Sequence, residues 1–195
     1  MTDTIASPAS HTVDVRHSRF RAQAAHAESI DAALGFLAEH ADRDATHNCW
    51  AYRIGAEYRS SDDGEPSGTA GRPILAAIDG QGLDEVVVVV TRRYGGIKLG
   101  AGGLVRAYGG AAAECLRSAV RRRLIELRTL AVDARFEDLG TVHVALSAHS
   151  ATKLAETFAS DGVQLRVSLP ADQVEALKVQ LRDATRNRVR VGDGE

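Results

Sequence analysis

The chain has few cysteines, one tryptophan and no long apolar run. Its two cysteines, Cys49 and Cys115, do not have the spacing of metal ligands, which favours small buried residues over a metal site or a disulfide framework. The longest strongly apolar run, Val86 to Val90, is far too short to cross a bilayer. The first residues lack the basic segment and apolar stretch of a signal peptide. We therefore expect a cytoplasmic protein without a membrane partner.

A strong excess of either charge is missing as well. The chain carries 24 lysines and arginines against 26 aspartates and glutamates, a formal net charge of −2. Nothing global therefore indicates a nucleic-acid-binding protein, and any basic surface must be local. A length of 195 residues suits one large domain or two small ones.

The most informative stretch begins with five consecutive valines, which predict a strand buried on both faces. A basic, glycine-rich loop follows, and from Leu104 the apolar residues have helical spacing. Glycines leave backbone amides uncovered and a helix N-terminus favours negative charge, so this stretch predicts an anion site. Tight turns and close packing are the alternative, since the loop matches neither the Walker A nor the dinucleotide-binding pattern. The candidate anion- or nucleic-acid-binding residues are Arg92, Arg93, Tyr94, Gly95, Gly96, Lys98, Gly100, Gly102, Gly103 and Arg106.

A second loop gathers three carboxylates, Asp62, Asp63 and Glu65. They either hold a divalent cation or form ion pairs with the cations of the glycine-rich stretch. His47 is either a general base near them or a structural polar contact. No Ser/His/Asp or Cys/His arrangement is present, so we assign no catalytic residue and no cofactor, and leave a metal open.

The order of predicted elements divides the chain into two domains. We expect a disordered leader at 1–11, a first domain at 12–127 and a second at 128–195. The turn formers of 60–71 predict an irregular loop, and 124–127 is predicted as a closing strand. The second domain follows the order βαββαβ, which is typical of a ferredoxin-like fold.

Three long segments resemble the IMPACT/YigZ family. They are His47-Asn48-Cys49-Trp50-Ala51-Tyr52, the run from Asp62 to Gly71, and the run from Arg92 to Tyr108. The resemblance covers about residues 12–120 strongly, and the rest through element order. One position differs, because the family usually has two aromatic residues before the paired glycines and here the first is Arg93.

The resemblance implies an α+β protein of two domains. The first would have the left-handed βαβ fold shared with a ribosomal small-subunit protein and domain IV of elongation factor G, and the second the ferredoxin-like fold of its domain V. Eukaryotic members regulate translation. We therefore expect a non-enzymatic, translation-linked regulator that binds RNA or the ribosome, or another phosphate-bearing ligand, through the glycine loop. The alternatives are a metal-assisted phosphoryl-transfer or hydrolytic enzyme and a protein-interaction module, and the oligomeric state stays open.

Overall fold

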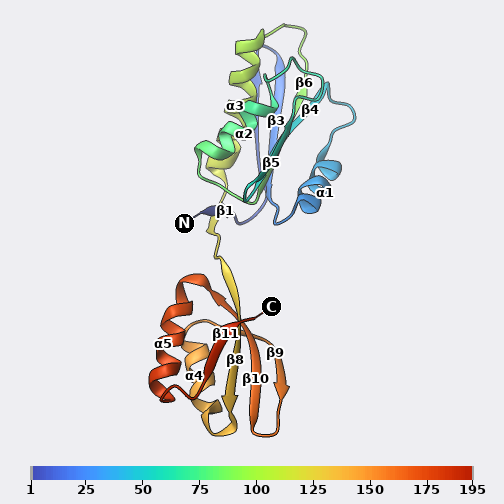
Figure 1. Ribbon diagram of the computed structural model, residues 1–195. Coiled ribbons are helices and arrows are strands. Elements are labelled where there is room, and N and C mark those ends of the chain that lie inside the picture. Colours follow the sequence, from blue (N-terminus) through green and yellow to red (C-terminus); the bar gives the residue numbers. More distant parts are fainter. Residues whose placement is uncertain (1, 195) are drawn as a thin grey trace. The chain divides into compact units, whose positions relative to one another are not determined.

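The computed structural model describes residues 2–194 and forms two compact units, divided between Leu124 and Ile125 (Figure 1). Each unit combines helices with an antiparallel sheet, so the predicted α+β organisation in two domains is confirmed. The division falls slightly before the predicted boundary at residue 127.

The first unit is built on a five-stranded antiparallel sheet in the order β2-β3-β6-β4-β5. Since β3 and β4 are both antiparallel to β6, they run parallel to each other on either side of it. Helix α1 (Ile30–His40) connects them as a βαβ crossover, and the Ser29 hydroxyl caps it by accepting from the amide of Ala32 at 3.1 Å. The strands are β2 Ala9–Val15, β3 Ser18–His26, β4 His47–Ile54, β5 Glu57–Ser61 and β6 Val86–Arg93.

Both faces of this sheet are covered, as the valine run predicts. Helices α2 (Gly71–Gly80) and α3 (Ala101–Ser118) pack on one face, and α1 packs on the other (Figure 1). Val88 and its alternate neighbours in β6 belong to the core under α2 and α3. Val87 and Val89 belong to the smaller core under α1. The lack of alternation thus has the predicted cause, burial on both faces.

The predicted disordered leader is wrong for the described residues. Strand β1 (Asp3–Ile5) pairs antiparallel with β7 (Arg121–Arg123), Ile5 is fully buried, and β2 already begins at Ala9. The predicted strand at 124–127 is also displaced, because β7 precedes it and β8 begins at its last residue. Both errors arise because β1 and β7 are far apart in the sequence and neither has an alternating pattern.

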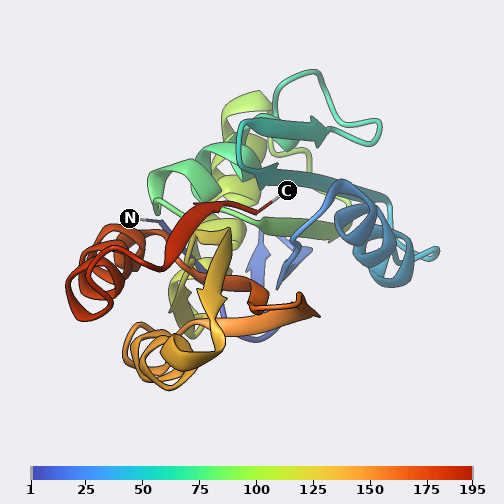
Figure 2. The same ribbon diagram turned by 60° about the horizontal axis from the view of Figure 1, so that its bottom comes forward.

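The second unit is a four-stranded antiparallel sheet in the order β11-β8-β10-β9. Its elements follow one another as βαββαβ, which is the predicted ferredoxin-like arrangement. Both helices pack on the same face, where alternate residues of β8 and β10 form a single core with them (Figure 2). The elements are β8 Leu127–Arg135, α4 Leu139–Ala148, β9 Thr152–Phe158, β10 Gly162–Pro170, α5 Val174–Ala184 and β11 Arg190–Asp193.

Two single 3-10 turns, Phe136–Asp138 and Ala171–Gln173, lead into α4 and α5. In the part of the chain that the structure describes, no helix combines the length and apolar character needed to span a membrane.

Candidate functional site

The glycine loop connects β6 to α3, and its glycines have distinct backbone roles. A Cβ on Gly95 would lie 2.0 Å from the carbonyl oxygen of His17, so only glycine fits against the β2–β3 hairpin there. Gly96 and Gly100 have φ values of 86° and 70°, in the left-handed region that favours glycine. Helix α3 begins at Ala101, earlier than the predicted Leu104. The loop therefore needs glycine for its path, whatever it binds.

The backbone amides of this loop are largely unengaged. Among residues 2–194, no hydrogen bond engages the amides of Gly96 or of 101–103, and Gly100 supplies no side-chain cap to α3. The first intrahelical bond joins the Leu104 amide to the Gly100 carbonyl at 3.0 Å. Unengaged amides at a helix N-terminus carry partial positive charge. Within residues 2–194, the backbone donors predicted for an anion are therefore free.

Two exposed cations accompany these amides. Neither Lys98 nor Arg106 has a carboxylate partner within the described part of the chain. A Cβ on Gly102 would lie 3.8 Å from Nη1 of Arg106, so this guanidinium lies next to the first turn of α3. A cation at this end of a helix is unfavourable for the helix dipole, which makes an external anion a suitable partner.

The acidic loop differs, because its carboxylates are engaged within the protein. Asp62 accepts hydrogen bonds from the amides of Gly68, Ala70 and Gly71 at 2.7, 3.0 and 2.8 Å, and so caps the N-terminus of α2. Burial works to raise the pKa of Asp62, but these three backbone donors outweigh it and hold the pKa below its usual value. The loop is therefore tied to the helix that follows it.

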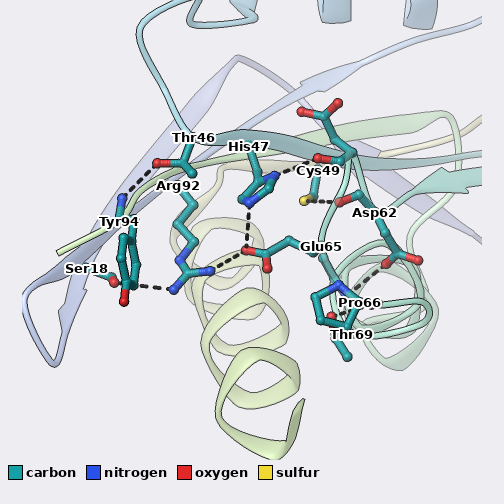
Figure 3. A network of polar contacts seen from close by, with 12 residues as sticks. Ser18, Thr46, His47, Cys49, Asp62, Glu65, Pro66, Thr69, Arg92 and Tyr94 are labelled. Atoms are coloured by element: carbon teal, nitrogen blue, oxygen red, sulfur yellow. Dashed lines mark hydrogen bonds and ion pairs between the residues drawn. The ribbon is translucent and has the colours of Figure 1, made fainter. Parts of the chain in front are cut away.

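Asp63 fastens the same loop to the start of β4. Its carboxylate accepts from the amide of Asn48 at 2.6 Å, and its carbonyl oxygen accepts from Nδ1 of His47 at 2.7 Å. His47 thus makes a polar contact within the protein, as one of the two interpretations of the sequence describes. Its Nε2 lies 3.9 Å from Oε1 of Glu65 (Figure 3).

Glu65 and Arg92 form a buried ion pair at the centre of this network. Nη1 of Arg92 lies 2.6 Å from Oε1 of Glu65, and the two side chains are 7% and 4% exposed. Tyr108 donates to the same oxygen at 2.8 Å. Nη2 of Arg92 reaches the Ser18 hydroxyl at 3.5 Å (Figure 3). Ser18 also accepts from the amide of Gly95 at 3.2 Å. The acidic loop is therefore connected to the base of the glycine loop through Arg92.

These positions correct the role predicted for Arg92. It is only 5% exposed and its charge is matched by Glu65, so it does not offer a free cation to an external anion. Strand alternation explains the burial, because Arg92 faces the same core as Val88 and Val90. Arg93 points to the opposite face, where it is exposed and pairs with Asp42 at 2.7 Å.

The structure does not support a metal site in the acidic loop. Asp62, Asp63 and Glu65 each have separate protein donors, and in the described residues no group of acidic, histidine or cysteine side chains is arranged to hold a metal ion. Cys49 donates its thiol to the carbonyl of Asp62, and burial raises its pKa to about 12. Burial likewise raises the pKa of Cys115 to about 11, so both cysteines are core thiols, unsuited to act as nucleophiles.

Sequence reasoning missed Ser18 and the polar role of Tyr108. Tyr108 lies on the apolar stripe of α3, so its position in the sequence predicts a packing role. The structure shows that its ring is fully buried and that its hydroxyl also donates a hydrogen bond to Glu65. Ser18 opens β3, and Ser18-Arg19-Phe20 also resembles the N-terminal pattern of the IMPACT/YigZ family, in addition to the three longer segments. That match was the available signal for it.

The fold and the two loops define a class of two-domain α+β protein in which an acidic loop supports a glycine-rich loop. The model of the Impact N-terminal domain matches residues 16–116, and a domain of unknown function, DUF1949, matches residues 132–188. The chain belongs to the IMPACT family.

Similar proteins span nearly the whole chain. It is 49% identical over 177 residues to the "IMPACT family member in pol 5'region" of Thermus thermophilus, covering 90% of this chain and 97% of that protein. It is 37% identical over 195 residues to the IMPACT family member YigZ of Escherichia coli, covering 95% and 94%. A solved structure described as a hypothetical protein is 35% identical, with a TM-score of 0.74 over 100% of this chain and 98% of that one.

Proposed function

We propose that this chain is a non-enzymatic, translation-linked protein of the cytoplasm that binds RNA, free or in the ribosome, through the glycine loop. The observation that carries the proposal is the open set of donors at the start of α3, where, among residues 2–194, the amides are unengaged and the cations Lys98 and Arg106 have no carboxylate partner. The translation-regulating role of eukaryotic members of the family supports the choice of RNA over other anions.

This geometry suits the phosphate backbone better than the bases. Amides, a helix dipole and extended cations recognise negatively charged oxygens, and such contacts fix position without reading sequence. We therefore expect weak sequence preference and an affinity that falls as salt rises. Because Arg92 is committed to Glu65, the charges that respond to salt are those of Lys98 and Arg106.

A titration of structured RNA at several salt concentrations tests this function. The Lys98→Ala/Arg106→Ala variant should bind more weakly, and the slope of log affinity against log salt should fall by roughly 1.5–2. The matched control, Arg59→Ala/Arg122→Ala, also removes two exposed cations of the first unit, on β5 and on β7 beyond the C-terminal end of α3, and should leave affinity and slope nearly unchanged.

Affinity that does not depend on salt would contradict the proposal, as would equal losses in the test and control variants. Either outcome would leave the protein-interaction module as the better interpretation of the fold.

A further inference from the structure

A shallow groove of about 490 Å³ lies beside the tip of the β2–β3 hairpin. It is distinct from the set of backbone amides at the start of α3. Most of its lining residues are basic or aromatic. The lining residues are Asp14, Arg16, His17, Arg19, Arg93 and Tyr94.

The groove is continuous with the glycine loop. Tyr94 is both a wall of the groove and the residue before Gly95, and Gly95 packs directly against the His17 carbonyl at the hairpin tip. The Gly95 amide donates to the hydroxyl of Ser18, the first residue of β3, so the loop contacts the hairpin where its turn enters β3. The groove therefore lies next to the start of the glycine loop.

Tyr94 provides a ring held in place within this wall. The residue is 44% exposed, and the guanidinium of Arg92 lies 5.3 Å from the ring centroid (Figure 3). Arg92 is fixed by Glu65, and the Tyr94 amide donates to the Thr46 hydroxyl at 3.0 Å. A fixed, partly exposed ring gives stacking area at low cost in conformational entropy.

Arginines gather on the adjoining sheet surface. Arg19 and Arg93 stand directly opposite each other on β3 and β6, a register at which like charges repel. Each is held by one carboxylate, Asp14 for Arg19 and Asp42 for Arg93.

A third arginine adds to these two without a balancing carboxylate. Arg16, at the hairpin tip, has a φ of 44° and no ionic partner among residues 2–194. Positive charge is therefore in excess around the groove, next to an exposed aromatic ring.

We propose that this groove is a second nucleotide subsite, an inference that rests on the function proposed above. The subsite stacks one unpaired base on Tyr94 and holds the neighbouring phosphate at Arg16. The ligand of the whole site is then single-stranded RNA, in a loop or at an end, running from the glycine loop onto the hairpin. In duplex RNA each base is already stacked in the helix, so its faces are not available to the ring.

Binding of two labelled probes tests the subsite: a single-stranded oligouridylate of about twelve nucleotides and an RNA duplex of about the same length. Tyr94→Leu should weaken single-strand binding about tenfold and leave duplex binding unchanged. Tyr94→Phe keeps the ring and should restore single-strand binding. Arg16→Asn, which tolerates the left-handed backbone, should lower the single-strand salt slope by about 0.7.

The outcomes separate this inference from the proposed function. If Lys98→Ala/Arg106→Ala weakens binding but Tyr94→Leu does not, the loop binds RNA and the groove subsite is wrong. Equal losses on both probes in Tyr94→Leu also contradict stacking, as does failure of Tyr94→Phe to restore binding. Binding of neither probe by the unaltered chain contradicts the proposed function and this inference together. Thermal unfolding of each variant establishes that the altered chains are folded.

Discussion

The acidic loop and the glycine loop use their polar groups in opposite ways. In the acidic loop Asp62, Asp63 and Glu65 all have donors within the protein, and Glu65 is buried with Arg92. In the glycine loop, within the part of the chain that the structure describes, the amides at the start of α3 and the cation of Lys98 have no partner. A polar group that is satisfied inside the protein stabilises the fold, whereas an exposed unsatisfied one is available to a ligand.

The difference assigns separate roles to two motifs that look equally functional in the sequence. The acidic loop acts as the support, since Glu65 holds Arg92, and Arg92 underlies Tyr94 and reaches Ser18. The glycine loop is the surface that faces outward. Substitutions in the first should therefore change stability, and substitutions in the second should change binding.

The largest expected effect comes from Glu65→Gln. The amide keeps the shape of the side chain but leaves the buried Arg92 charge without a counter-charge, so we expect a loss of about 3–5 kcal/mol in the free energy of unfolding. Urea denaturation measures it. Glu114→Gln removes an exposed partner of Arg117 on α3 and should cost less than about 1 kcal/mol. Similar losses in the two variants would show that Glu65 is not the support described here.

Asp62→Asn should have the next largest effect, about 2 kcal/mol near neutral pH, because one amide oxygen cannot serve the three donors that the carboxylate serves. The folded-state pKa of Asp62 lies below its unfolded value near 3.9. Its stabilisation is therefore fully present above that value and is lost as the pH falls through the folded pKa.

Urea denaturation of both proteins between about pH 7 and pH 3 tests this linkage. The stability difference between the unaltered chain and Asp62→Asn should shrink as the medium becomes acidic. Asp161→Asn, at an exposed carboxylate in the turn between β9 and β10, serves as the matched control and should change little. A difference independent of pH would argue against the capping role of the charged Asp62.

Much of the fold was predictable because its signals are local. Ser29 precedes a helical pattern and caps α1, and the valine run shows burial on both faces through its lack of alternation. The second domain was recognised because each of its elements has its own periodicity. The strand β1 has no such signal, since it is only three residues long and its partner lies near the other end of the first unit.

The candidate site was predictable in its backbone and less so in its side chains. The glycines marked the loop, but Arg92 was assigned to the anion site although its position in β6 turns its side chain inward. Continuing the alternation of β6 beyond Val90 places Arg92 on the core face, and that signal was present. An ion pair between the acidic loop and this stretch was one of the two alternatives, but the carboxylate that meets Arg92 was not identifiable, because Glu65 lies 27 residues away in an irregular loop whose path depends on the whole fold.

The smallest expected effect on stability in the comparison comes from Gly96→Ala. Nothing lies within 4 Å of the added Cβ, so the cost is that of the left-handed backbone, about 1 kcal/mol. Gly82→Ala is a matched control, since Gly82 also has a positive φ and open space around it, on the loop after α2.

The two glycine variants should lose similar stability but differ in RNA binding. A methyl group at Gly96 hinders approach to its free amide, so affinity should fall severalfold while the salt slope stays the same, because no charge is removed. RNA titrations of both variants at two salt concentrations make the comparison. If both bind RNA as the unaltered chain does, the amide of Gly96 is not a phosphate donor, and the site reduces to the cations Lys98 and Arg106.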